Sequence, residues 1–313
     1  MITKTLHKIA KDFYVSKGYI HNDNLGRIVK SDSAKESIIE ALKNAVYGQY
    51  YCLEKKKHDT MHTDPFFIES LTKIFPDDKY TERNWKVVEL LGEQKIKVSK
   101  HGIYLCLDIR KDTLLEEMPE VNQLIGVRFS CHFPNVSPGF YLYKGKSGEL
   151  DFGEGLSRVY FNLKRVSAIS FTKKLLYILN ELEIVFQFKI LQTLSDSGRV
   201  DNSVLYFSKK DKDLVFTQLE MLYDERFFKK INSDFHLVLY PGIGYAEEPS
   251  NNDNGKESFG THRSGIIAES LYDQLIVAKS KEISIATISA KFIVNGIHPE
   301  SVYIESIFDM VTP

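Results

Sequence analysis

The residues best suited to chemistry lie in the stretch from Ile184 to Phe207, IVFQFKILQTLSDSGRVDNSVLYF. Its pattern predicts a strand that carries Lys189, a loop that carries Arg199, and a second strand that ends at Tyr206. The neighbours of the lysine are apolar, so the first strand is expected to be buried on at least one face. Burial and nearby positive charge both shift a lysine toward its neutral form, which acts as a base near neutral pH. The simpler interpretation, a strand lysine whose ammonium group reaches water, stays open.

Other basic residues of the C-terminal half extend this stretch into a candidate anion site. Arg158 precedes it, and the pair His262–Arg263 follows it. The planar guanidinium group matches phosphate oxygens, so several arginines around one lysine describe an anion site that contains a base. The alternative for each arginine is an ordinary solvated side chain.

The composition argues against several other classes of function. The chain has 313 residues, a net charge of −1 and 27% charged residues, so nothing indicates bulk attraction to nucleic acid or to anionic membranes. No apolar run is long enough to span a membrane. The three cysteines are scattered and form no CxxC pair, which fits reduced thiols in a cytoplasmic protein. The nine histidines include no HExxH motif, so we do not expect a bound metal. Neither PGIG at 241–244 nor DFGEG at 151–155 has the context of a nucleotide-binding or kinase motif.

Hydrophobic periodicity predicts an α+β fold of mainly antiparallel sheets flanked by helices, in two subdomains. A loop-like stretch at 145–155 divides an N-terminal subdomain, 1–150, from a C-terminal core, 151–313. We expect the first 75 residues to be mainly helical and strands to begin at Asn84. The expected elements of the core are helices at 166–180, 212–232 and 266–279 and a strand at 236–240, with a long loop between the last two.

The most distinctive segments of the chain are SPGFYLYKG (137–145), SRVYFNL (157–163), FQFKILQ (186–192), RVDNSVLYF (199–207), LYPGIGYAEEP (239–249) and SFGTHRSGIIAESL (258–271). In combination they resemble the HopA-type type III effector family, which also includes the lyases of class V lanthipeptide and thioamitide biosynthesis. The resemblance extends from about Thr63 to the end. The family is distantly similar to the phosphothreonine lyases secreted by type III systems, which place a strand lysine, an arginine, a strand-end tyrosine and a later arginine in the order of Lys189, Arg199, Tyr206 and Arg263.

This resemblance implies a core like that of the phosphothreonine lyases and a β-elimination that needs no cofactor. Phosphate would leave a phosphoserine or phosphothreonine of a precursor peptide, giving dehydroalanine or dehydrobutyrine. Lys189 would remove the α-proton as the neutral amine. Arg199 and Arg263, together with Arg158, would bind the phosphate dianion and lower the pKa of the lysine.

The chain departs from the secreted lyases at the residue that protonates the leaving group. Those enzymes use a strand histidine, and Asn162 stands at that position here. Asparagine cannot supply the proton, although it can hydrogen-bond the phosphate or the substrate amide. The remaining candidates for the general acid are Tyr206 and His262, and a tethered core tyrosine is the alternative for the first.

The start of the chain favours a biosynthetic enzyme over an injected effector. Met1–Tyr14 reads as an amphipathic helix with mixed charges rather than an extended Ser-rich segment. We therefore expect a cytoplasmic lyase that acts after a separate Ser/Thr kinase, because this chain has no ATP-binding motif. The aromatic surface around Phe140, Tyr141 and Tyr143 is a candidate leader-peptide site that works by strand addition, with an ordinary core as the alternative. A non-catalytic protein that binds a protein partner is the competing class of function, and a phosphatase is a third.

Overall fold

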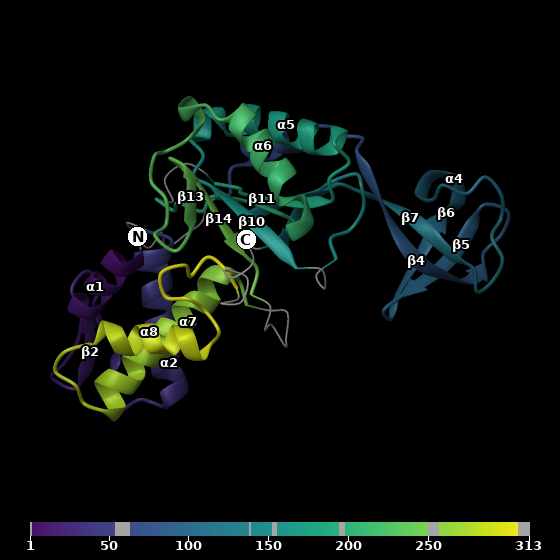
Figure 1. Ribbon diagram of the computed structural model, residues 1–313. Coiled ribbons are helices and arrows are strands. Elements are labelled where there is room, and N and C mark those ends of the chain that lie inside the picture. Colours follow the sequence, from purple (N-terminus) through teal and green to yellow (C-terminus); the bar gives the residue numbers. More distant parts are fainter. Residues whose placement is uncertain are drawn as a thin grey trace.

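The computed structural model describes residues 2–53, 63–137, 139–151, 155–193, 198–249 and 257–305. Within these ranges a seven-stranded antiparallel sheet forms the centre, in the order β13-β14-β10-β12-β11-β9-β8. Figure 1 shows α5 and α6 along one side of this sheet, and α1, α2, α7 and α8 gathered in a helical lobe on the other. A four-stranded sheet, β6-β5-β4-β7, projects away from both as a separate lobe, which we call the β4–β7 lobe.

The helices have the following bounds: α1 Ile2–Asp12, α2 Lys35–Val46, α3 Pro65–Thr72, α4 Ile109–Asp112, α5 Arg165–Glu181, α6 Lys212–Leu222, α7 Phe259–Tyr272 and α8 Ile285–Val294, with short helices η1 Tyr47–Tyr51, η3 Lys209–Asp211, η4 Glu225–Phe227 and η5 Asp273–Val277. The strands are β1 Phe13–Ser16, β2 Tyr19–Asn22, β3 Gly26–Lys30, β4 Lys79–Leu90, β5 Lys95–Lys100, β6 Ile103–Asp108, β7 Leu124–Ser130, β8 His132–Ser137, β9 Phe140–Lys144, β10 Leu156–Phe161, β11 Phe186–Leu191, β12 Ser203–Ser208, β13 Leu237–Tyr240 and β14 Ile243–Glu247.

Alternation along the central strands produces two very different faces of the seven-stranded sheet. One face buries Phe161, Phe188 and Leu205 in a core shared with Leu175 of α5 and Leu219 of α6. The opposite face contributes Tyr160, Val204 and Ala246 to a second core, built with α2, α7 and α8. The middle of the second face therefore packs against the helical lobe, and this face carries the polar residues discussed below.

The predicted α+β class with antiparallel sheets and flanking helices is confirmed, as is the helix at 166–180, which is α5. Residues 1–75 are less helical than predicted, because they also contain the sheet β1-β2-β3. The turns of this sheet use Gly18 and Gly26 at positive φ, which only glycine adopts at little cost. The sequence FYVSKGYIHNDNLGRIVK does alternate in polarity, so a hairpin signal was present in it.

Two helix boundaries also differ from the predictions, and each difference has a local cause. The helix expected at 212–232 ends at Leu222, since Tyr223 is extended and Asp224 caps a new short helix. The helix expected to start at 266 begins at Phe259, because the Ser258 side chain accepts a hydrogen bond from the Thr261 N–H and caps it. Seven residues of the expected loop are therefore helical.

Elements from both sides of the predicted subdomain boundary near residue 150 pack together. Strands β8 and β9, which precede it, are hydrogen-bonded into the same sheet as β10 to β14. Helix α2 and α7, from opposite ends of the chain, pack closely against each other. The division at 150 stays a prediction about folding units, whereas the central sheet draws on both sides of it.

A pair of glycines on α7 allows a test of the packing between α7 and η1. A Cβ at Gly260 would lie 2.4 Å from the buried ring of Tyr51, whereas a Cβ at Gly265 would meet only the Lys43 side chain, at 3.7 Å. We expect Gly260→Ala to lower the free energy of unfolding by about 1–3 kcal/mol through overpacking. Gly265→Ala should raise it by about 0.5–1 kcal/mol, since alanine favours helix. Urea denaturation of both variants measures this, and equal effects would contradict the packing.

Candidate active site

Lys189, Tyr206 and Arg158 lie side by side on three adjacent strands, β11, β12 and β10. Arg158 is directly paired with Tyr206, and Tyr206 with Gln187 on the other side. Lys189 is two residues from Gln187, so its side chain leaves the same face of the sheet. This is the face toward the helical lobe. The fold thus brings together three of the predicted site residues that the sequence placed as much as 48 positions apart.

The phenol ring of Tyr206 lies between two cations. The Lys189 Nζ atom is 5.4 Å from the ring centroid, and the Arg158 guanidinium carbon is 4.8 Å from it. Both distances are within the range of a cation–π contact. Within the described ranges, no hydrogen bond or ion pair engages the Lys189 ammonium group. Its amine is therefore held in place mainly by the strand and by the aromatic ring.

Glu248 completes this cluster, although sequence reasoning did not single it out. Its two carboxylate oxygens accept hydrogen bonds from Nε and an Nη atom of Arg158, a residue 90 positions away. The arginine is buried, and its other Nη atom lies 3.4 Å from the Tyr160 hydroxyl. Glu248 directly follows the buried strand β14, and an acidic residue at the end of a buried strand was the only sequence signal for it.

Burial and the neighbouring charges shift the titration of the cluster. Burial, and then the positive charge of Arg158, lower the pKa of Lys189, while Glu248 acts in the opposite direction. Burial also raises the pKa of the Tyr206 phenol, with Arg158 opposing and Glu248 and Asp201 reinforcing that shift. At neutral pH the lysine is therefore closer to its neutral form than an exposed lysine, and the tyrosine is protonated.

Arg199 lies in the loop between β11 and β12 and is bound to residues other than Lys189. Its Nε and Nη donate hydrogen bonds to both carboxylate oxygens of Asp201 at 3.0 and 2.9 Å. A further hydrogen bond of 3.1 Å reaches the hydroxyl of Tyr47 in η1. Asp201 in turn acts on Tyr206 through its charge. Arg199 thus belongs to the same sheet–helix interface as Lys189. It is linked to the lysine only indirectly, through Asp201 and Tyr206.

Arg263, on α7, is completely buried and bound by the segment at 302–305. Its Nε donates to the Val302 carbonyl at 2.7 Å, and an Nη atom forms an ion pair of 2.8 Å with Glu305. The other Nη is 2.6 Å from Nδ1 of His262. Burial, followed by the charge of Arg263, lowers the pKa of His262. The two residues lie on the same side of the sheet as Lys189, and Arg263 is close enough to Tyr160 for their charges to interact.

Asn162 lies just beyond the end of β10 and is buried. Its amide nitrogen donates a hydrogen bond of 2.9 Å to the carbonyl of Ile231. Its side-chain oxygen is buried and accepts no hydrogen bond from the described residues. By strand geometry it stands roughly 13 Å along the chain from Arg158. No contact among the described residues joins it to the lysine.

An aromatic layer beneath the cluster holds these strands against the helical lobe. His236 stacks on Tyr160 with ring centroids 4.0 Å apart, and its Nε2 lies 3.1 Å from the hydroxyl of Tyr51. Gly244 is required there, because a Cβ would lie 2.8 Å from the Cβ of His236. This layer, which the sequence did not indicate, positions Tyr160 beside Arg158.

Two features are not found among the described residues. No cluster of three or more His, Cys, Asp or Glu side chains in the described part of the chain has the geometry to hold a metal ion. Nor is any helix among these residues both long and apolar enough to cross a membrane.

Comparison with known proteins places the chain in a family. Residues 131–304, which include the whole lysine cluster, match the HopA1 effector protein family. The chain belongs to this family, as the resemblance in its sequence predicted. A comparison with curated proteins gives no match.

Two solved structures share the fold. The first is the effector protein from Pseudomonas syringae pv. tomato strain DC3000, with a TM-score of 0.53, 13% identity and 97% of each chain covered. The second is the effector protein from Pseudomonas syringae pv. syringae strain 61, with a TM-score of 0.50 and 12% identity, covering 84% of this chain and 90% of that one. At such identities the likeness extends to the fold alone.

The buried histidine predicts acid sensitivity. Burial lowers the pKa of His236 from 6.5 to about 3, so below pH 6.5 the unfolded chain takes up a proton that the folded protein does not. Stability should fall as the pH drops from 6.5 toward 3, by at most about 1.4 kcal/mol per pH unit from this group. His236→Phe should reduce that slope while lowering stability at pH 7 through loss of the Tyr51 hydrogen bond. Urea denaturation at several pH values, with the exposed His7→Phe as control, measures this; an unchanged slope would contradict it.

Proposed function

We propose that this protein is a phosphoserine/phosphothreonine lyase. The observation that supports the proposal most strongly is the state of Lys189: a partly buried amine beside Arg158, with its pKa lowered and no hydrogen-bonding partner among the described residues. Such a group is suited to abstract a proton at neutral pH. An anion-binding arginine lies within the same cluster, on the adjacent side of Tyr206. A base next to an anion site is what β-elimination of phosphate requires.

The reaction proceeds in one balanced elimination. The neutral amine of Lys189 takes the α-proton of the phosphorylated residue and becomes an ammonium. The electrons of the Cα–H bond form the Cα=Cβ double bond, the Cβ–O bond breaks, and its electron pair leaves with the phosphate. The products are inorganic phosphate and a dehydroalanine or dehydrobutyrine residue. No oxidant or reductant enters this balance.

The position of the phosphate follows from the contact between Arg158 and Glu248. A carboxylate bound in two places by a guanidinium is the closest protein mimic of a bound phosphate. We assign this position to the substrate phosphate, which would replace Glu248 on Arg158. The replacement keeps a negative charge opposite the arginine and brings the Cβ–O bond close to Tyr206 and Lys189. Held in this way, the Cα–H bond is oriented toward the amine.

The remaining predicted residues take roles according to their distance from the lysine. Tyr206, protonated and adjacent, is the preferred general acid for the leaving phosphate. Arg199 adds positive potential and fixes the loop between the two strands through Asp201. For Arg263 and Asn162 a direct phosphate contact stays a prediction, as does the acid role of His262, since their polar contacts in this structure are with other parts of the chain.

The proposed substrate is a peptide that has already been phosphorylated by a separate Ser/Thr kinase. This assignment rests on the family resemblance to the lyases of lanthipeptide and thioamitide biosynthesis and on the absence of an ATP-binding motif from the sequence. The competing proposal is a non-catalytic effector-type protein that binds a protein partner through the same fold. The ion pair between Arg158 and Glu248 also fits that function, because it neutralises the arginine without a ligand.

Replacing the lysine separates these proposals. Incubated with a phosphoserine peptide, the unaltered protein should yield a product that has lost phosphoric acid, as detected by mass spectrometry, whereas a phosphatase would yield the plain hydroxyl. Lys189→Met and Lys189→Arg should both lower kcat by about 10²–10⁴-fold, because neither offers a neutral amine. Lys189→Met should be no less stable at pH 7, since it removes a disfavoured charge. An unmodified peptide after incubation with the unaltered protein would exclude the lyase.

Glu248 provides an independent test through pH. The rate should rise with pH as Lys189 loses its proton, and Glu248 raises the pKa of that lysine. Glu248→Gln should therefore shift the midpoint of the kcat/KM profile to lower pH, and it should bind inorganic phosphate more tightly because the competing carboxylate is gone. Glu225→Gln, an exposed carboxylate outside the site, is the control. A midpoint that moves to higher pH would contradict the assignment.

A further inference from the structure

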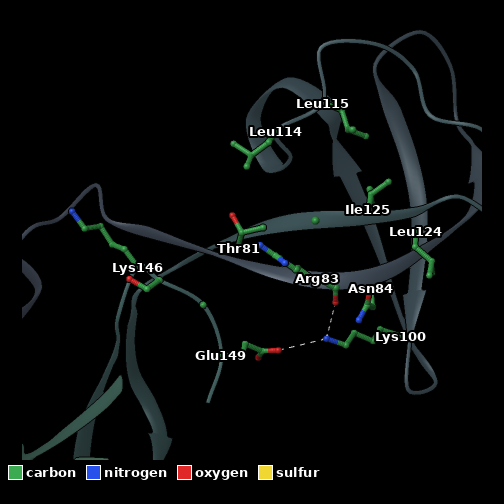
Figure 2. Close-up of a pocket in the computed structure, with 13 residues that line it drawn as sticks. Thr81, Arg83, Asn84, Lys100, Leu114, Leu115, Leu124, Ile125, Lys146 and Glu149 are labelled. Carbon is green, nitrogen blue, oxygen red and sulfur yellow. Dashed lines mark hydrogen bonds and ion pairs between the residues drawn. The ribbon is translucent and has the colours of Figure 1, made fainter. Parts of the chain in front are cut away.

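The junction between the β4–β7 lobe and the central sheet contains a groove with a volume of about 840 Å³. We call it the lobe groove. Figure 2 shows Leu114 and Leu115 across from Glu149, with Thr81 and Arg83 of β4 between them. Two of its leucines are unusually exposed for apolar residues, Leu114 at 69% and Leu124 at 61%. The groove therefore offers apolar surface that the described residues leave uncovered.

The charges that line the lobe groove are unbalanced. Of the lining residues, Lys100 and Glu149 form an ion pair of 3.5 Å, and outside the lining Glu82 lies 2.6 Å from Lys100 and Lys144 lies 3.4 Å from Glu149. The two carboxylates are thus matched by the two lysines. The exposed cations Arg83 and Lys146, which also line the groove, form no ion pair with the described residues, so the groove carries surplus positive charge. A ligand that complements it has acidic groups next to apolar ones.

The lobe groove lies beyond the end of β9, the strand next to the one that carries Lys189. Lys189 is paired with Leu142 of β9, and Gln187 with Lys144, so Lys144 shares the face of the catalytic lysine. Lys146, at the wall of the groove, is four residues beyond Leu142, or roughly 13 Å along the strand direction. An extended peptide covers about 3.3–3.6 Å per residue. A residue about four to six positions from the one bound at Lys189 would therefore reach the groove.

We propose that the lobe groove binds a segment of the peptide substrate itself, acidic and leucine-containing, about four to six residues from the phosphorylated position. The identity of the bound peptide as the substrate rests on the proposed lyase function. The binding of an acidic, leucine-containing peptide in the groove does not. Arg83 and Lys146 contact the acidic side chains, and the leucines take the apolar ones. The loop beyond Leu115 carries Glu116, Glu117 and Glu120. These carboxylates repel an acidic peptide, so the acid-binding surface ends at this loop.

The experiment compares fluorescent phosphoserine peptides that carry a Glu/Leu segment or a Gly/Ser segment, on either side of the phosphoserine. Binding is measured by anisotropy with the Lys189→Met protein, and kcat/KM with the active one. We expect the Glu/Leu peptide of one orientation to bind at least tenfold more tightly than its Gly/Ser counterpart. Arg83→Glu combined with Lys146→Glu should abolish that preference and leave kcat/KM for the Gly/Ser peptide unchanged. The matched control is Lys86→Glu combined with Lys95→Glu, on the same lobe but outside the groove, which should preserve the preference.

Two results would overturn this inference: equal binding of both peptides, or a preference that survives the reversal of charge at Arg83 and Lys146. A Glu/Leu peptide without phosphate separates this failure from that of the proposed function. If it binds and the binding depends on the two cations, the groove is a peptide site even when no elimination occurs. If elimination occurs without any preference for the Glu/Leu segment, the lyase stands and the groove binds something else, such as an acidic surface of a partner protein.

Discussion

The repulsion between two cations on one sheet face is the interaction on which the rest of this site depends. Lys189 and Arg158 lie on either side of one phenol ring, and neither can leave, because each is part of a central strand. Such an arrangement is tolerated only when a carboxylate offsets the charge, and Glu248 supplies it. The same arrangement lowers the pKa of the lysine, so a larger share of its amine is neutral at pH 7 than for an exposed lysine. The charge state of the cluster therefore depends on a balance of three charges.

The two faces of the central sheet differ in the surroundings that they provide for these charges. The face of the central sheet toward α5 and α6 is mainly apolar and supplies a rigid support. The face toward the helical lobe mixes aromatic rings with charged groups, and the rings of Tyr51, Tyr160 and His236 exclude water from beneath the arginine. Low local dielectric strengthens every charge interaction above that layer. The helical lobe contributes through the binding of Arg199 by Tyr47 and through the buried Arg263, which holds the segment at 302–305 against the sheet.

Membership in the HopA1 effector protein family agrees with this arrangement, because the matched residues include all of β10 to β14 and α7. The β4–β7 lobe lies outside the matched range, apart from its junction with the sheet. The matched range thus contains the strands that carry Lys189, Arg158 and Tyr206, whereas Arg83 of the lobe groove lies outside it.

The amino-acid sequence by itself determined the class of fold, the helix α5, and the order of lysine, arginine and tyrosine, since each depends on local periodicity or on a short motif. It also placed Lys189 in a buried strand, because its neighbours are apolar. Only the tertiary structure decided which charges meet. The Arg158–Glu248 pair spans 90 positions, and the contacts of Arg263 with Val302 span 39, so both depend on the sheet order and on helix packing, which no local pattern encodes. The same holds for His236, whose burial follows from stacking on a strand that is distant in the sequence.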